Sequence, residues 1–233
     1  MQDKNLDYFK KGNYEEIKTN FITDGITALS HVAAFQRKYE KADNDSVINE
    51  LHDAIVGRHL GFKYVNTNKH GLDCKYDKDI DIFLESKVAS LSADSISATF
   101  NDTTLEKAEV FKDKKTWLAL SVWATESELS FICFGQNEKI GEYLEEKVKT
   151  QTQKSQRRTQ TISLKELIFT YNFKILPIGQ TSGEVITLLT SKSTRSYGGI
   201  KNSDFISYEQ ISILNNENED NVVTNNAGEE NKM

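Results

Sequence analysis

The feature that most restricts the fold is a short, nearly continuous apolar run, WLALSVW at 117–123. Strands that are covered on both faces have this character, whereas strands with one solvated face alternate apolar and polar residues. A second apolar stretch, SFICFG at 130–135, follows closely. Neither approaches the roughly 18 consecutive apolar residues of a membrane span. The run therefore predicts a central sheet with helices packed on both faces.

Residue periodicity around this run predicts the other elements. The expected helices cover residues 5–40, 47–60, 103–115, 137–149 and 163–172. The expected strands cover 62–65, 72–76, 80–89, 117–123, 130–135 and 173–179. Ser163 and Glu166 have the spacing of a capping box, and Gly61 suits a helix C-cap. This order predicts an α/β fold with a mixed central β-sheet flanked by helices.

Length and composition predict one domain followed by a tail. The 233 residues suit a single core, expected over 1–214 with a helical N-terminal part. Residues 215–233 are rich in Asn and Glu and nearly lack large apolar side chains, so we expect a disordered acidic tail. The start, MQDKNLDYFKKGNYEE, has no apolar signal region, which predicts a cytoplasmic protein without a membrane anchor.

The cysteines and histidines do not predict a zinc site. Cys74 and Cys133 both lie in apolar, strand-like stretches, where buried thiols are the expected form. His52 and His59 are seven residues apart without an acidic partner at metal spacing, so we expect surface or core roles for both. Turn composition accounts for His70.

The net charge of −6 is unevenly distributed. The tail has five acids and one lysine, a net −4, which leaves −2 for residues 1–214. Segment 147–165 holds six positive residues and no acid, and 188–203 holds three and no acid. Since the electric field at a groove is local, either segment suits phosphate contacts, although a solvated surface explains each equally well.

The stretch IDIFLESKVA at 80–89 places charges on one face of a strand. Because side chains alternate along a strand, Asp81, Phe83, Glu85 and Lys87 project to the same side. Glu85 and Lys87 are then about 6.6 Å apart along the strand. Burying such charges is costly unless a metal, a partner or a substrate compensates them.

A second carboxylate is expected beside Glu85. Asp73 precedes it by twelve positions, and a short connection at 76–79 allows a hairpin to join their strands. Asp79 and Asp81 are the alternatives, but the first falls in an expected turn and the second shares the strand of Glu85. Two carboxylates with open positions suit Mg²⁺, and a nearby lysine can orient water and add positive charge.

Asp73, eleven intervening residues and then Glu85-Ser86-Lys87 resemble the PD-(D/E)XK nuclease superfamily, which includes the type II restriction endonucleases. The resemblance covers about residues 44–135 and implies a restriction-endonuclease-like core. It also implies that Asp73, Glu85 and the Ser86 carbonyl bind Mg²⁺, that Lys87 positions the attacking water, and that Glu50 assists from the preceding helix. Leu72 stands where many members have proline.

The resemblance implies a sequence-specific endodeoxyribonuclease that cleaves double-stranded DNA as a homodimer. The alternatives are a structure-specific repair or recombination nuclease and an inactive DNA-binding relative. Candidate phosphate contacts are Lys147, Lys149, Lys154, Arg157 and Arg158. Candidate base-reading residues, in an expected loop, are Lys192, Arg195, Lys201 and Asn202.

Overall fold

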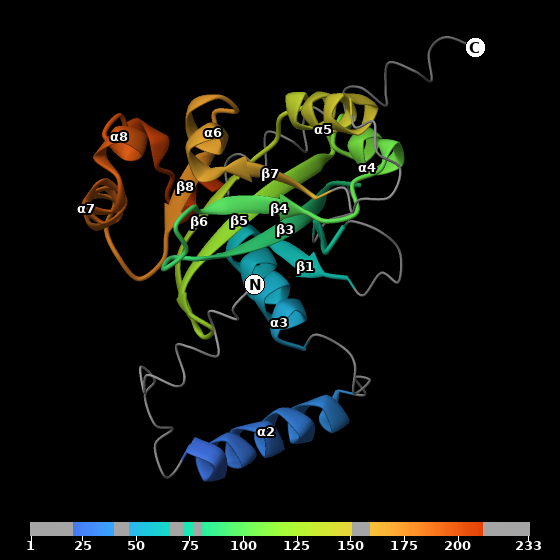
Figure 1. Cartoon of the computed structure of the whole chain (residues 1–233), viewed down its shortest axis with the longest axis vertical. Coiled ribbons are helices and arrows are strands. Elements are labelled where there is room, and N and C mark those ends of the chain that lie inside the picture. Colours follow the sequence, from blue (N-terminus) through green and yellow to red (C-terminus); the bar gives the residue numbers. More distant parts are fainter. Residues whose placement is uncertain (1–20, 40–46, 66–71, 77–80, 151–158, 212–233) are drawn as a thin grey trace, which may run out of the picture. The chain divides into compact units, whose positions relative to one another are not determined.

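Figure 1 shows the computed structural model of the chain. It describes residues 21–39, 47–65, 72–76, 81–150 and 159–211. The chain divides into two compact units, Met1–Val47 and Ile48–Met233, and each is described by itself. The expected acidic tail, 215–233, lies outside the described residues.

The first unit contains helix α2, Phe21–Lys38. This helix falls within the range predicted from the sequence, and Gly25 does not interrupt it. Several large apolar side chains of this helix are exposed, namely Ile26 at 64%, Leu29 at 68%, Val32 at 38% and Phe35 at 38% of their surface.

Helix α3, Val47–Leu60, forms as predicted, and from Ile48 onward it belongs to the second unit. Gly61 follows it with a φ of +81°, a left-handed conformation that costs glycine little. Strand β1, Phe62–Tyr64, then pairs antiparallel with β2, Cys74–Tyr76. These two short strands precede an eight-residue strand, Phe83–Ser90, in the same sheet.

Six strands form the central sheet, in the order β1-β2-β3-β5-β6-β8 (Figure 1). The other four are β3 (Phe83–Ser90), β5 (Thr116–Thr125), β6 (Glu128–Gly135) and β8 (Lys174–Pro177). Strands β3 and β5 run parallel, whereas every other neighbouring pair is antiparallel. The structure thus confirms the predicted α/β fold with a mixed central sheet flanked by helices.

A second, two-stranded sheet was not predicted. It pairs β4, Ser97–Phe100, with β7, Gln160–Ser163, in antiparallel register. Ala98, Phe100 and Ile162 from this pair belong to the same buried cluster as Leu118 and Leu120 of β5. The small sheet therefore covers one face of the large one.

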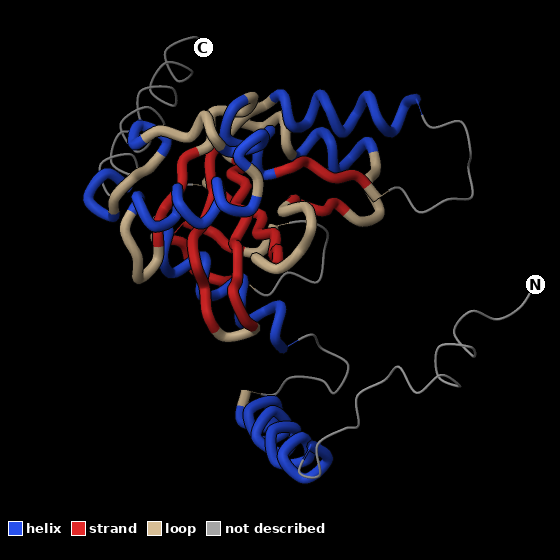
Figure 2. Tube along the Cα trace, turned by 60° about the vertical axis from the view of Figure 1, so that its left-hand side comes forward, coloured by secondary structure: helices blue, strands red, loops and turns tan. Residues whose placement is uncertain are grey.

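Helices α4 (Leu105–Val110), α5 (Lys139–Thr150) and α6 (Leu164–Phe169) pack over the same face. The capping box predicted for Ser163 and Glu166 is present at the start of α6. Figure 2 shows helices and strands of this unit in successive layers.

The segment 180–203, which includes the loop expected for the base-reading candidates Lys192, Arg195, Lys201 and Asn202, is mostly helical, so the prediction of a loop was wrong. It contains α7 (Ser182–Lys192), α8 (Thr194–Tyr197) and the start of a 3₁₀ turn, η1 (Asn202–Asp204). Thr181 and Glu184 form a capping box for α7. Val185 and Leu189 then anchor the helix in the core.

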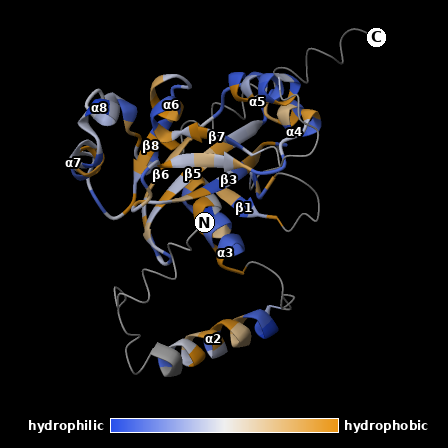
Figure 3. Ribbon diagram, in the orientation of Figure 1, coloured by the Kyte–Doolittle hydropathy of each residue, from blue (hydrophilic) through white to orange (hydrophobic). Residues whose placement is uncertain are grey.

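Two buried clusters occupy the two faces of the sheet. One joins β4, β7 and helices α4 to α7 to the sheet, and the other joins α3 and the segment 206–211 to its opposite face. Cys74 and Cys133 are free and buried, as expected. In Figure 3 the helices over the sheet mix hydrophilic and hydrophobic residues, as such packing requires.

His52 is buried and lies against the core rather than at a metal site. Its ring stacks on Trp123 with centroids 4.0 Å apart, and its Nε2 is 2.8 Å from the carbonyl oxygen of Glu126. His59 contacts the Tyr208 hydroxyl through Nδ1 at 2.6 Å. His70 lies outside the described residues.

Within the described ranges, no helix is both long and apolar enough to span a membrane.

Candidate functional site

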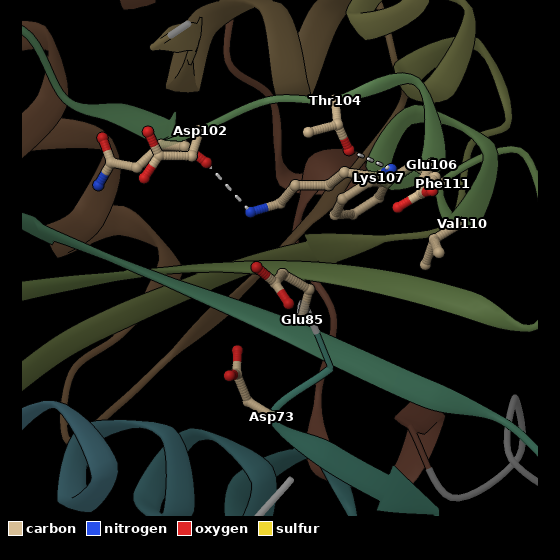
Figure 4. A pocket seen from close by; sticks show the side chains of 9 residues that line it. Asp73, Glu85, Asp102, Thr104, Glu106, Lys107, Val110 and Phe111 are labelled. Atoms are coloured by element: carbon tan, nitrogen blue, oxygen red, sulfur yellow. Dashed lines mark hydrogen bonds between the residues drawn. The ribbon is translucent and has the colours of Figure 1, made fainter. Parts of the chain in front are cut away.

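The candidate site is a pocket of about 440 Å³ beside strand β3. Figure 4 shows Asp73 and Glu85 approaching it from the large sheet and Lys107 approaching from α4. Its lining consists of Asp73, Glu85, Asn101, Asp102, Thr104, Glu106, Lys107, Val110 and Phe111. The volume can hold a phosphodiester group, and seven of the nine lining residues are polar or charged.

Glu85 lies at the bottom of the pocket and is only 2% exposed. Its Oε1 accepts a hydrogen bond from Lys87 Nζ, while its Oε2 has no hydrogen-bond partner among the described residues. Burial raises the pKa of Glu85, and the charge of Asp73 raises it further, against the opposing effect of Lys87. The site thus contains a buried carboxylate oxygen that is free to accept a ligand.

Asp73 reaches Glu85 because the predicted hairpin forms. Its backbone N–H donates to the Leu84 carbonyl at 3.0 Å, and β2 pairs with β3 through Cys74 and Leu84. The Asp73 Oδ2 accepts the backbone N–H of Ser86 at 2.8 Å. This bond fixes one carboxylate oxygen and places the backbone of Ser86 beside the site.

Lys87 makes an ion pair with Glu85, one of the two carboxylates. Its side chain is 17% exposed, and its Nζ lies 5.7 Å from the centroid of the Phe100 ring in addition to pairing with Glu85. The backbone of this residue is also held, because Ser121 Oγ donates to the Lys87 carbonyl at 3.1 Å. Asp73, Glu85 and Lys87 therefore come together as the sequence pattern predicted.

Asp53 of α3 is a further carboxylate at the site that was not predicted. Burial raises its pKa from 3.8 to about 7, and Asp73 and Glu85 add to the effect. Lys87 and the nearby Ser86 hydroxyl oppose it, although that hydroxyl does not meet the geometry of a hydrogen bond. Asp53 lies three, four and seven positions before Val56, Gly57 and Leu60, a spacing that puts all four on one helix face. This spacing was a usable signal in the sequence, and the structure buries the last three residues.

Glu50, the predicted helix carboxylate, is half-buried one turn before Asp53. Its charge acts on Tyr64, whose pKa rises to about 12 through burial and then through Glu50, Asp53 and Asp73. The assistance of Glu50 to the site stays a prediction.

Lys107 of α4 is the second residue that was not predicted. It is half-buried, and its Nζ donates to the Asn101 carbonyl at 3.4 Å. Burial lowers its pKa, as does Lys87, whereas Glu85, Asp73 and Asp102 oppose the shift. Ala108 and Phe111 bury the adjoining face of α4, which carries Lys107 to the edge of the pocket.

The other acids considered for the first position lie elsewhere. Asp81 makes an ion pair with Lys75 at 3.0 Å, has a side chain that is 66% exposed, and does not line the pocket. Asp79 lies outside the described residues. Among the described candidates, Asp73 is the one that the fold brings to Glu85.

The carboxylates fit a hard divalent cation, although they form no complete cage. The described part of the chain contains no group of three or more His, Cys, Asp or Glu arranged to hold a metal. Mg²⁺ commonly binds through only one or two carboxylates, with water and substrate oxygens completing its shell. The unpartnered Oε2 of buried Glu85 and the raised pKa values are features that such a cation would relieve.

The predicted phosphate contacts that are described lie on α5. Lys149 pairs with Glu145 at 2.6 Å, and the Nζ of Lys147 lies 5.2 Å from the centroid of the Tyr143 ring. The other members of this group, Lys154, Arg157 and Arg158, fall outside the described residues.

The predicted base-reading residues lie on helices and on the turn that follows them, not on one loop. Lys192 ends α7 and donates to the Leu91 carbonyl at 3.0 Å, while Arg195 is exposed in α8. Lys201 and Asn202 are exposed at η1. None of the four lines the pocket of Asp73 and Glu85.

Comparison with protein-family models, curated proteins and solved structures found no match to this chain.

Proposed function

We propose that this chain is a magnesium-dependent endodeoxyribonuclease of the PD-(D/E)XK type. One observation carries the proposal: Asp73 and Glu85 share a pocket, Lys87 contacts Glu85, and the buried Glu85 Oε2 has no hydrogen-bond partner within the described part of the chain. A pair of carboxylates beside a lysine suits hydrolysis of a phosphodiester, because the reaction needs a cation, an oriented water and compensation of negative charge.

Each residue has a defined part in this proposal. Asp73 and Glu85 would hold the ion, and Asp53 lies close enough to add charge to the same region. When bound, Mg²⁺ supplies positive charge against the reacting phosphate and favours ionisation of water. Lys87 orients the attacking water, whose oxygen bonds to phosphorus as the bond to the 3′ oxygen breaks. The products are a 5′-phosphate and a 3′-hydroxyl.

The proposed substrate is double-stranded DNA in the cytoplasm, cut at a specific sequence in the manner of type II restriction enzymes. The acid-free segments 147–165 and 188–203 support DNA binding, since positive charge near a phosphate backbone releases counterions. A homodimer is proposed because two-fold symmetry matches a palindromic site.

Digestion of several unmethylated phage DNAs tests the proposal. The full chain is incubated with each DNA in Mg²⁺, and EDTA is added to a parallel set. Discrete bands that require Mg²⁺ are the expected result. A smear would contradict sequence-specific cleavage and favour a nuclease that recognises DNA structure. Intact DNA under every condition would overturn the nuclease assignment.

A further inference from the structure

Two lysines approach Glu85, and they differ in their partners. Lys87 comes from the same strand and is paired with the Glu85 carboxylate. Lys107 comes from α4, on the opposite wall of the pocket (Figure 4). The described residues provide Lys107 with no ion pair within 4.0 Å, and its Nζ has one long hydrogen bond, to the Asn101 carbonyl at 3.4 Å. An ammonium has three donors, so Lys107 has hydrogen-bonding capacity left for a ligand.

The surroundings of Lys107 indicate the charge of that ligand. The ammonium is half-buried, which disfavours its charged form, and Lys87 adds a like charge. Asp73 and Glu85 now provide much of the compensation. A divalent cation held by these carboxylates would cancel that compensation and leave Lys87 and Lys107 facing more positive charge. An anion in the pocket would restore the balance.

The position of Lys107 selects the kind of anion. Its pocket of about 440 Å³ also contains Asp73 and Glu85, so a group bound there meets the candidate metal ligands and Lys107 together. A phosphate presents several oxygens in different directions and can contact both walls at once. Lysine binds phosphate as a point charge with rotatable donors, which suits this arrangement.

We propose that Lys107 binds a non-bridging oxygen of the DNA backbone phosphate held in this pocket, on the wall opposite Asp73. This inference rests on the proposed nuclease function and adds a substrate-binding residue to it. The sequence pattern of Asp73, Glu85 and Lys87 does not include such a residue. Lys107 would anchor the phosphate in the ground state, whereas Lys87 acts on the water.

Binding of DNA in the absence of cleavage tests the inference. A short fluorescein-labelled duplex containing a mapped cleavage site is titrated with wild type, Lys107→Met and Lys107→Arg in Ca²⁺, which also binds carboxylate oxygens and replaces Mg²⁺ to prevent cleavage. Methionine keeps an apolar stem without the charge, and arginine keeps the charge. The matched control is Lys114→Met, because Lys114 is exposed and lies outside both the pocket and the two acid-free segments. Circular dichroism melting verifies folding, and Lys107→Gln replaces Lys107→Met if the latter unfolds.

We expect Lys107→Met to weaken binding by about tenfold and to lower the salt dependence by the equivalent of about one phosphate contact. Lys107→Arg should retain most of the affinity, and Lys114→Met should match wild type. A duplex with a neutral methylphosphonate at the contacted position should bind wild type and Lys107→Met equally. Scanning this substitution along the strand identifies that position.

Three outcomes would overturn the inference. Wild-type affinity and salt dependence in Lys107→Met would do so, even if its cleavage were lost, because a phosphate anchor must contribute to binding. An affinity loss that no methylphosphonate position abolishes would assign Lys107 a structural role. If wild type neither binds nor cleaves DNA, the proposed nuclease function fails first, and the inference fails with it.

Discussion

Glu85 shows at the scale of one residue what a buried, partly compensated carboxylate costs the fold. A carboxylate that is only 2% exposed has lost most of its hydration, and a single lysine compensates one of its oxygens. Such burial is costly unless further partners complete the shell. The neighbouring acids Asp53 and Asp73 increase the cost, because like charges repel. These buried carboxylates therefore make the folded state less stable than neutral side chains at the same positions would.

Replacing Asp53 by Asn should show this cost as a dependence on pH. The folded-state pKa of about 7 lies above the ordinary 3.8, so the folded state holds the proton more tightly than the unfolded state. The destabilisation is absent below about pH 3.8, grows as pH rises, and is complete above about pH 7. Without divalent ions, Asp53→Asn should be about 1–3 kcal/mol more stable than wild type at pH 8 and similar to it near pH 4.

Urea denaturation at the two pH values measures this difference. Asp94→Asn is the matched control, since Asp94 is exposed, and it should follow wild type at both. An equal or lower stability of Asp53→Asn at pH 8 would contradict the account of Asp53.

Residue patterns predicted part of the site. Asp73, Glu85 and Lys87 were found because strand alternation and the hairpin connection specify their side and their proximity. Asp53 and Lys107 were not found, because each belongs to a helix whose distance from the strands depends on tertiary packing. Burial around Val56 and Leu60 turns Asp53 inward, and burial of Ala108 and Phe111 does the same for Lys107.

At the scale of elements, segments with a strong local pattern were predicted best. Helix α3, the first three strands and the apolar strands β5 and β6 all fall close to their predicted ranges. Strands β4 and β7 were missed because each has four residues and pairs with a partner about sixty positions away. Helix α7 was missed because Gly183 and the β-branched residues Val185 and Ile186 have modest helix propensity.

The capping box of α7 offers a test of what stabilises that helix. Thr181 Oγ1 accepts the backbone N–H of Glu184 at 3.3 Å, and the Glu184 carboxylate accepts the Thr181 N–H at 2.7 Å. Thr181→Ala should lower the free energy of unfolding by about 1 kcal/mol. Thr187→Ala, an exposed change within α7, should leave it unchanged or slightly higher, because alanine favours the helix. Equal urea midpoints for the two variants would contradict the capping contribution.

At the scale of the whole molecule, the net charge of −6 hides a local excess of positive residues. Neutralising Arg157 and Arg158 should weaken binding to every DNA sequence and flatten its salt dependence, as expected for phosphate contacts. Arg195→Ala, at an exposed position of α8, should instead lower discrimination between cognate and single-mismatch duplexes. Titrations of both duplexes at several salt concentrations distinguish the two effects. An unchanged cognate-to-mismatch ratio in Arg195→Ala would place base reading elsewhere.

The most direct test of the central claim compares DNA cleavage by wild type with that of Asp73→Asn and Glu85→Gln. Both substitutions remove a charge and keep the shape, so the fold should persist. The matched control is Glu138→Gln, since Glu138 is exposed and outside the pocket. Single-turnover digestion in Mg²⁺ should fall by about a thousandfold or more in each site variant and stay at the wild-type rate in the control. Near-normal cleavage by Glu85→Gln would contradict the assignment of this pocket as a metal-dependent nuclease site.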